Sequence, residues 1–140
     1  MARMLGGLME AAAFFGAIAH EFDGGHRKEL EIAAEILERK AKSYPGEYQA
    51  GWAALKPETI ARKATGDSPL LETGAMRDSI THNSDDHEAY VGSNDKTLLY
   101  QEFGTSRGIP PRPVLGLAMV EAEEEVISAV GSSVMATLVK

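Results

Sequence analysis

Two histidines, His82 and His87, flank the polar run Asn83-Ser84-Asp85-Asp86. Imidazole and carboxylate groups bind divalent metal ions, so His82, Asp85, Asp86 and His87 could form the centre of a small metal-dependent hydrolase. The competing interpretation is a polar hairpin turn, because Asp, Asn and Ser are frequent in turns for reasons of backbone conformation. The spacing favours the turn, and we predict no metal ligand here.

Three other segments contain parts of reactive motifs and lack the rest. His20 and His26 do not have the i,i+4 spacing that places two metal ligands on one helical face. The serine in Gly66-Asp67-Ser68-Pro69 has no base or oxyanion hole that the sequence can place. The segment Gly104–Gly108 lacks the lysine and the following helix start of a phosphate-binding loop. We therefore predict a protein that is not an enzyme, without catalytic residues, cofactor or metal.

The most informative segment is Leu99–Pro113, a polar loop between two apolar stretches. Gly104 can adopt a positive φ and turn the chain sharply after Phe103. The segment Pro110–Pro113 contains three prolines, which fix φ and remove backbone donors. Arg112, between these prolines, would project from a stiff and extended backbone. Such a loop suits a contact surface better than a reaction site.

Two pairs of side chains could support this surface. Glu102 and Arg112 are predicted to form an ion pair that holds the proline segment against the preceding turn, because arginine binds carboxylates in a bidentate geometry. Alternatively, either group reaches a neighbouring subunit. Tyr48 and Trp52 lie in a long connection, where large aromatics serve as interface anchors. The alternative for these two residues is packing over the core of their own subunit.

Bulk composition excludes several classes of protein. The chain has 140 residues, enough for one domain, with 44% hydrophobic and 25% charged residues. It contains no cysteine, so disulfides and thiolate metal sites are excluded. The net charge is −7 and the basic residues are scattered, which predicts only weak, sequence-independent affinity for DNA. The apolar run Ala11–Ala19 is too short to cross a membrane and has no clean cleavage site behind it.

Local patterns predict an α+β fold. A small antiparallel sheet is packed by a long N-terminal helix and a C-terminal helix, with a long loop between the first helix and the sheet. Residues 1–140 form one domain with parts 1–44 (helical), 45–77 (extended loop with a short helix), 78–113 (sheet and proline loop) and 114–140 (C-terminal helix). The expected helices are Met4–Phe22, His26–Tyr44, Glu58–Lys63 after Pro57, Ala75–Asp78 and Val114–Val139. The expected strands are Asp78–Asn83, Ala89–Ser93 and a third near Arg107–Ile109. The segment Leu98–Phe103 fits either a helical turn or a short strand.

Four segments, in order, carry a resemblance to a known family. They are WAALKPETIARK (Trp52–Lys63), LLETGAMRDSI (Leu70–Ile80), AYVGS (Ala89–Ser93) and the loop with Glu-Phe-Gly-Thr followed by Pro-Pro-Arg-Pro. Together they resemble the tail-completion and head–tail joining (neck) proteins of tailed bacteriophages, over roughly Trp52–Ala118. That family usually has an aromatic residue directly after the Arg-Pro pair, whereas this chain has Val114 and Leu115.

The resemblance implies a non-enzymatic structural protein of the virion. It would be made in the host bacterial cytoplasm and would form a ring, a hexamer, at the head–tail junction, completing the tail and joining it to the neck. Its partners would be copies of itself, the tail tube protein and the neck or head-completion proteins, with genomic DNA passing through without sequence-specific binding and with no membrane. A head-completion (stopper) protein or an assembly factor is the alternative within this class, and the metal-dependent hydrolase is the alternative outside it.

Ring contacts of this kind join two different patches of each subunit. We expect these patches to be the loops Tyr48–Leu71 and Tyr100–Pro113. The predicted interface residues are Tyr48, Trp52, Tyr100, Glu102, Phe103, Gly104, Thr105, Arg107, Pro110, Pro111, Arg112 and Pro113.

Two further surfaces bear on partner contacts. The acids Glu121, Glu123, Glu124 and Glu125 form either a solvated helix face or a channel lining that repels phosphate. The helix Met4–Phe22 carries more apolar surface than one small sheet covers, which predicts contact with a partner.

Overall fold

The computed structural model describes residues 26–138. The predicted helix Met4–Phe22, the partner contact expected of it, and His20 lie outside these residues. Within them the chain forms a two-stranded antiparallel sheet and six helices, so the predicted α+β class is confirmed.

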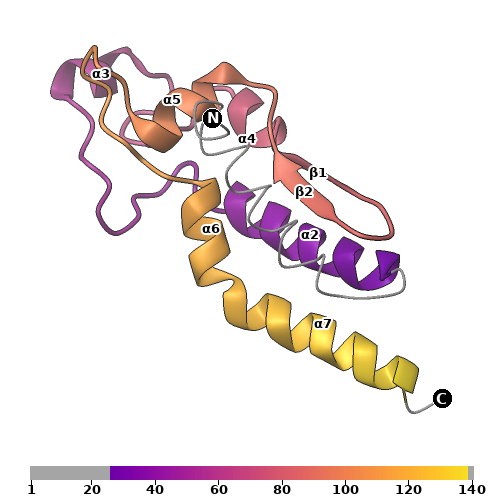
Figure 1. Cartoon of the computed structure of the whole chain (residues 1–140). Helices are drawn as coiled ribbons and strands as arrows, with labels where there is room; N and C mark the ends of the chain where they lie inside the picture. Colours follow the sequence, from indigo (N-terminus) through magenta and orange to yellow (C-terminus); the bar gives the residue numbers. More distant parts are fainter. Residues whose placement is uncertain (1–25, 139–140) are drawn as a thin grey trace.

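Helix α2 (Arg27–Lys42) is the centre of the described fold. Its buried stripe includes Leu30, Ala33, Leu37 and Ala41, which recur at helical spacing as predicted. One side of α2 packs against the sheet and another side against the two C-terminal helices (Figure 1). The helix ends before Pro45, which has no N–H to continue it.

The sheet is a hairpin of β1 (Thr81–Ser84) and β2 (Ala89–Gly92), with His82 opposite Val91. Asp85 closes the predicted turn, because its carboxylate accepts hydrogen bonds from the backbone N–H groups of His87 and Glu88 at 2.8 and 2.9 Å. The third strand expected near Arg107–Ile109 is wrong, since no described strand lies there. Gly108 has φ +108° and prolines follow, so this backbone lacks both the extended conformation and the donors of a ladder.

Short helices connect the core to the loops. They are α3 (Pro57–Arg62), α4 (Ala75–Asp78) and α5 (Lys96–Phe103). Leu98–Phe103, which the sequence left undecided between helix and strand, is helical. Asp95 accepts a hydrogen bond from the Thr97 N–H at 2.9 Å and caps the first turn of α5. Leu98, fully buried, anchors α5 in the core.

The C-terminal segment was predicted as one helix and forms two, α6 (Leu115–Glu121) and α7 (Glu123–Leu138). Ala122 lies between them with φ −91° and ψ −1°, outside regular helical geometry. It is buried, and hydrogen bonds from Ala122 N–H to Ala118 O and from Val126 N–H to Ala122 O carry the chain through the bend. The bend lets both helices follow the surface of α2 (Figure 1).

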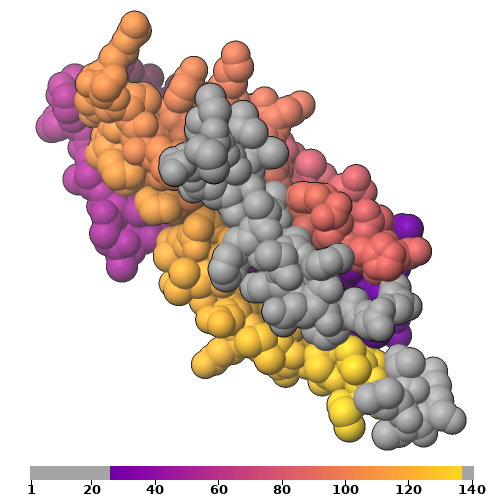
Figure 2. Space-filling model, viewed as in Figure 1, coloured from indigo at the N-terminus to yellow at the C-terminus, as the bar shows by residue number. Residues whose placement is uncertain are grey.

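The described part of the chain is elongated. The loops with α3 and α5 form one end, and the C-terminal part of α7 with the hairpin tip forms the other (Figures 1 and 2). The first of these is called the loop end and the second the hairpin end. No helix among residues 26–138 is long and apolar enough to cross a membrane.

Candidate subunit interface and histidine cluster

The proline loop, residues 104–113, begins with a glycine that no other residue could replace without strain. Gly104 has φ +71° and ψ 179°, a region of backbone conformation almost restricted to glycine. A Cβ atom added there would lie 2.6 Å from the carbonyl oxygen of Ile109 and 3.0 Å from Pro111. The backbone returns on itself, with Thr105 N–H donating to Ile109 O at 2.9 Å. The predicted sharp turn after Phe103 is thus present.

Glu102 anchors the loop to the core. Its side chain is buried, and its two carboxylate oxygens accept hydrogen bonds from the backbone N–H groups of Val114, Leu115 and Gly116 at 2.8 to 2.9 Å. These N–H groups start α6 and have no partner within the helix. Glu102 therefore caps a helix that begins thirteen residues further along the chain.

Arg112 anchors the other side of the loop. It is 5% exposed, and its guanidinium donates to the carbonyl oxygens of Ala53 at 2.7 and 3.0 Å and of Ala54 at 3.3 Å. The predicted Glu102–Arg112 ion pair is therefore wrong. Each charge is instead bound by backbone groups of the opposite polarity.

Trp52 and Tyr48 behave differently from one another. Trp52 is 8% exposed and packs edge-on against Tyr44, with ring centroids 6.5 Å apart, so its side chain belongs to the core of its own subunit. Tyr48 is 40% exposed, donates a hydrogen bond to Asp67 and accepts one from the Leu55 N–H at 3.0 Å. The hydrogen bond to Asp67 raises the pKa of the Tyr48 hydroxyl.

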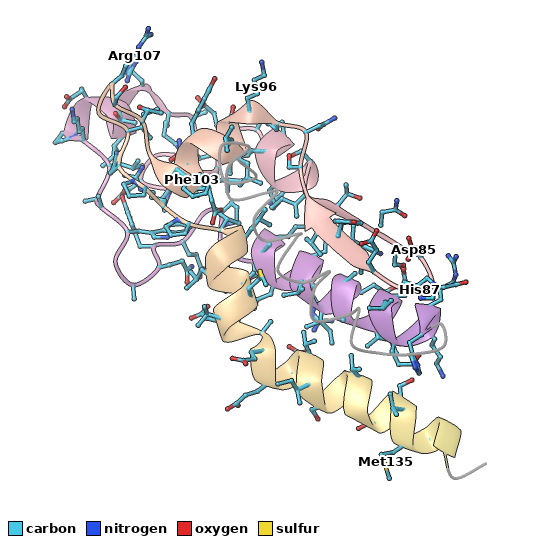
Figure 3. The ribbon with its side chains drawn as sticks, in the orientation of Figure 1. Asp85, His87, Lys96, Phe103, Arg107 and Met135 are labelled. Atoms are coloured by element: carbon cyan, nitrogen blue, oxygen red, sulfur yellow. The ribbon has the colours of Figure 1, made fainter. Side chains whose placement is uncertain are left out.

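The remaining predicted interface residues lie on an accessible surface. Tyr100 and Phe103, on α5, are 45% and 49% exposed. Ile109, which the sequence did not predict as an interface residue, is 37% exposed, and these three residues are called the apolar part of the loop surface. Gly104, Thr105 and Pro110 are half-buried, whereas Arg107, Pro111 and Pro113 are exposed. Figure 3 shows Arg107 and Lys96 projecting from this end of the molecule. Buried Trp52, Glu102 and Arg112 support the surface from behind.

A groove of about 760 Å³ lies beside the loop, bordered by the chain around α3, by α4 and by the proline segment. Its lining includes five basic side chains and two acids, which are Lys56, Arg62, Lys63, Arg107, Arg112, Glu72 and Asp95. The groove therefore carries an excess of positive charge, which suits an acidic protein segment better than a neutral ligand.

The acids of the C-terminal helices are exposed, and two of them contact α2 or Tyr44 just beyond its end. Glu121 accepts a hydrogen bond from the Tyr44 hydroxyl at 2.6 Å. Burial and this hydrogen bond raise the pKa of Tyr44. Glu125 pairs with Arg39. Glu123 and Glu124, at the start of α7, have no hydrogen bond or ion pair with another residue of 26–138.

The hairpin does not assemble the ligands of the alternative hydrolase site. Asp85 caps the turn, Asp86 pairs with Arg27 at 2.9 Å, and His87 is exposed at the tip (Figure 3). Of these four residues only His82 forms hydrogen bonds with carboxylates, and those carboxylates belong to α2. The ligand set of the alternative hydrolase site is therefore wrong. Side chains alternate along β1, and this alternation places His82 on the face of the sheet toward α2.

His82 is held between two carboxylates of α2. Its Nδ1 lies 2.6 Å from Glu38 Oε2, and its Nε2 lies 2.7 Å from Glu31 Oε1. Burial lowers the pKa of His82, but these two hydrogen bonds outweigh burial and leave the pKa raised. Ser84 also donates a hydrogen bond to Glu31, and together with His82 it lowers the pKa of that carboxyl.

Sequence reasoning missed this cluster, although α2 contained a signal for it. Glu31, Glu35 and Glu38 recur at helical spacing on one side of α2, next to its apolar stripe. Their partner could be named only once the hairpin had been placed on that side.

No family model, curated protein or solved structure matches this chain. The function is therefore inferred from the residues and from the geometry of the chain itself.

Proposed function

We propose that this chain is a non-enzymatic structural protein of a tailed-bacteriophage virion. It forms a hexameric ring at the head–tail junction, which completes the tail and joins it to the neck. Its neighbours are copies of itself, the tail tube protein and the neck proteins, and genomic DNA passes through the ring. The proposal starts from the resemblance of the four segments between Trp52 and Ala118.

The observation that carries the proposal is the exposed apolar surface of the proline loop. Tyr100, Phe103 and Ile109 remain exposed although Glu102 and Arg112 hold the backbone beneath them. A contact surface with a fixed backbone loses little conformational entropy on binding. Large aromatic side chains on such a surface are the residues that contribute most to protein–protein interfaces.

Charge supports a ring in which each subunit uses two different patches. The groove beside the loop is bordered mostly by basic side chains, and the start of α7 exposes Glu123 and Glu124. Patches of opposite charge on one chain favour head-to-tail contact between copies, and such contacts form a ring where the rotation from copy to copy closes. The net charge of −7 favours weak binding of the ring to the DNA that moves through it.

The experiment compares two aromatic surfaces of the same chain. Tyr100→Ala combined with Phe103→Ala removes the loop surface, whereas Tyr90→Ala removes an equally exposed tyrosine on β2. Light scattering and native mass spectrometry should find a wild-type assembly of about six times the 15.0 kDa chain, formed in solution or on isolated tails. We expect the double variant to lose assembly and the Tyr90 variant to retain it, with unchanged circular dichroism in both.

Imaging of the assembled particle locates the chain. A ring at the head-proximal end of the tail supports the proposal, whereas a ring within the head portal favours a stopper, and absence from the finished particle favours an assembly factor. A chain that stays monomeric in solution and occurs in no viral particle contradicts the whole class.

A further inference from the structure

His82, Glu31 and Glu35 place one nitrogen and two carboxylate oxygens close together on the hairpin side of α2. One potential ligand atom from each residue lies within 4.8 Å of the others. Zn²⁺ binds imidazole nitrogen and carboxylate oxygen at about 2.0–2.2 Å, so an ion can occupy the space between three such atoms after small side-chain rotations. Glu31 and Glu35 are separated by four residues and therefore lie on the same helical face.

Glu38 completes a second feature of metal sites. It binds Nδ1 of His82 at 2.6 Å and so orients the ring, with Nε2 toward Glu31. Histidines that bind metals typically donate their other ring N–H to a carboxylate in this way. The side chains of Glu38 and His82 are each 19% exposed, so the ring is held in a partly buried setting.

Charge and access at the cluster also favour a cation. Glu35 is exposed and has no hydrogen bond or ion pair with another residue of 26–138. Two nearby cations already have carboxylate partners, since Lys42 pairs with Glu38 at 3.1 Å and Arg27 pairs with Asp86. An open surface hollow borders Glu31 and Glu35, with Lys28 at its rim, and provides an entry path and room for a water ligand.

We propose that His82, Glu31 and Glu35 form a binding site for a divalent transition-metal ion, with Zn²⁺ as the best fit and Glu38 as the positioning residue. Binding replaces the direct hydrogen bond between His82 Nε2 and Glu31 with two metal–ligand bonds and releases any proton on Nε2 to solvent. The ion thereby joins β1 to α2. A ligand set with one imidazole favours Zn²⁺ over Mg²⁺, which prefers oxygen ligands and keeps its own water. The site is independent of the ring proposal.

The test is calorimetric titration of ZnCl₂ into the full-length protein after treatment with a chelator and buffer exchange. We expect a single-site isotherm that MgCl₂ does not reproduce, and a rise of several degrees in the melting temperature at saturating Zn²⁺. Glu35→Gln should weaken Zn²⁺ binding tenfold or more. Because Glu35 is exposed and unpaired among the described residues, this variant should fold normally. Glu38→Gln should weaken binding by about tenfold to a hundredfold through the orientation of His82.

Matched controls make the result decisive. His82→Ala should abolish the isotherm, whereas His87→Ala, at the exposed hairpin tip, should leave it unchanged. Glu124→Gln, an exposed acid on α7, should also leave it unchanged. The proposal is overturned if the wild-type protein shows no Zn²⁺ isotherm, if Glu35→Gln binds Zn²⁺ as tightly as the wild type, or if His87→Ala alone removes binding.

Discussion

The two ends of this molecule use buried or half-buried charges in opposite ways. At the loop end, Glu102 and Arg112 bind backbone N–H and carbonyl groups and make no contact with one another. At the hairpin end, His82 binds the side chains of Glu31 and Glu38. Charges satisfied by backbone fix the path of the chain, because those backbone groups have no other partner. Charges satisfied by side chains can exchange a proton or accept a metal ion, because the partners can rotate.

The comparison suggests a division of roles. The loop end has a fixed backbone below an exposed apolar surface, which suits a lasting protein contact. The hairpin end keeps an accessible set of ligands whose occupancy can change. The variants below test whether the charged side chains stabilise each end through backbone partners or through side-chain partners.

Glu102→Ala should have the largest effect on stability. It removes both oxygens that accept the first N–H groups of α6 and leaves those donors buried without a partner. The free energy of unfolding should fall by about 3–5 kcal/mol, measured by urea denaturation. Glu102→Gln retains one acceptor oxygen, so its free energy of unfolding should fall by clearly less. Equal losses in the two variants would contradict the capping role.

Gly104→Ala should have the next largest effect on stability. The added Cβ meets Ile109 O at 2.6 Å, and the backbone conformation is one that alanine avoids, so we expect a loss of about 2–4 kcal/mol. Gly66→Ala is the matched control, since Gly66 also has positive φ (+68°) but nothing lies within 4 Å of its Cβ position. That control should lose only about 1 kcal/mol. A similar loss at both positions would show that strain, and not the close approach of Ile109, limits the loop.

Asp85→Asn should have the smallest effect on stability, and this effect should disappear at low pH. Hydrogen bonds from the His87 and Glu88 N–H groups hold the pKa of Asp85 below its ordinary value of 3.8. The folded pKa is lowered, so this contribution to stability is present above pH 3.8 and disappears as pH falls through the folded pKa. The urea midpoints of wild type and Asp85→Asn should therefore differ at pH 6 and converge near pH 2. A constant difference across this range would contradict the assignment.

Several features of the fold could be predicted because their cause is local. The turn at Asp85 and the helix start at Pro57 each depend on residues within a few positions of one another. The stripe of α2 follows from helical periodicity. The single C-terminal helix was a wrong prediction because no local signal marks Ala122, whose bend follows from packing against α2.

The candidate sites were only partly predictable. The proline loop could be recognised from its prolines and from Gly104, and its exposed aromatics could be named. The partners of Glu102 and Arg112 could not be named, since opposite charges in one loop suggested an ion pair. Backbone N–H and C=O groups are the same in almost every residue, so a sequence pattern does not show which of them need a side-chain partner. A buried backbone group without a hydrogen bond nevertheless costs free energy.

The amino-acid sequence by itself determined the α+β class, the hairpin, the stiff proline loop and the phage resemblance from which the proposed ring function starts. Only the tertiary structure decided which charges meet, because Arg112 and Ala53 are 59 positions apart and His82 and Glu31 are 51 apart. Local conformation depends on neighbours along the chain and can be read from them. Contacts at such separations depend on how α2, the hairpin and the loops pack, and that packing is a property of the whole chain.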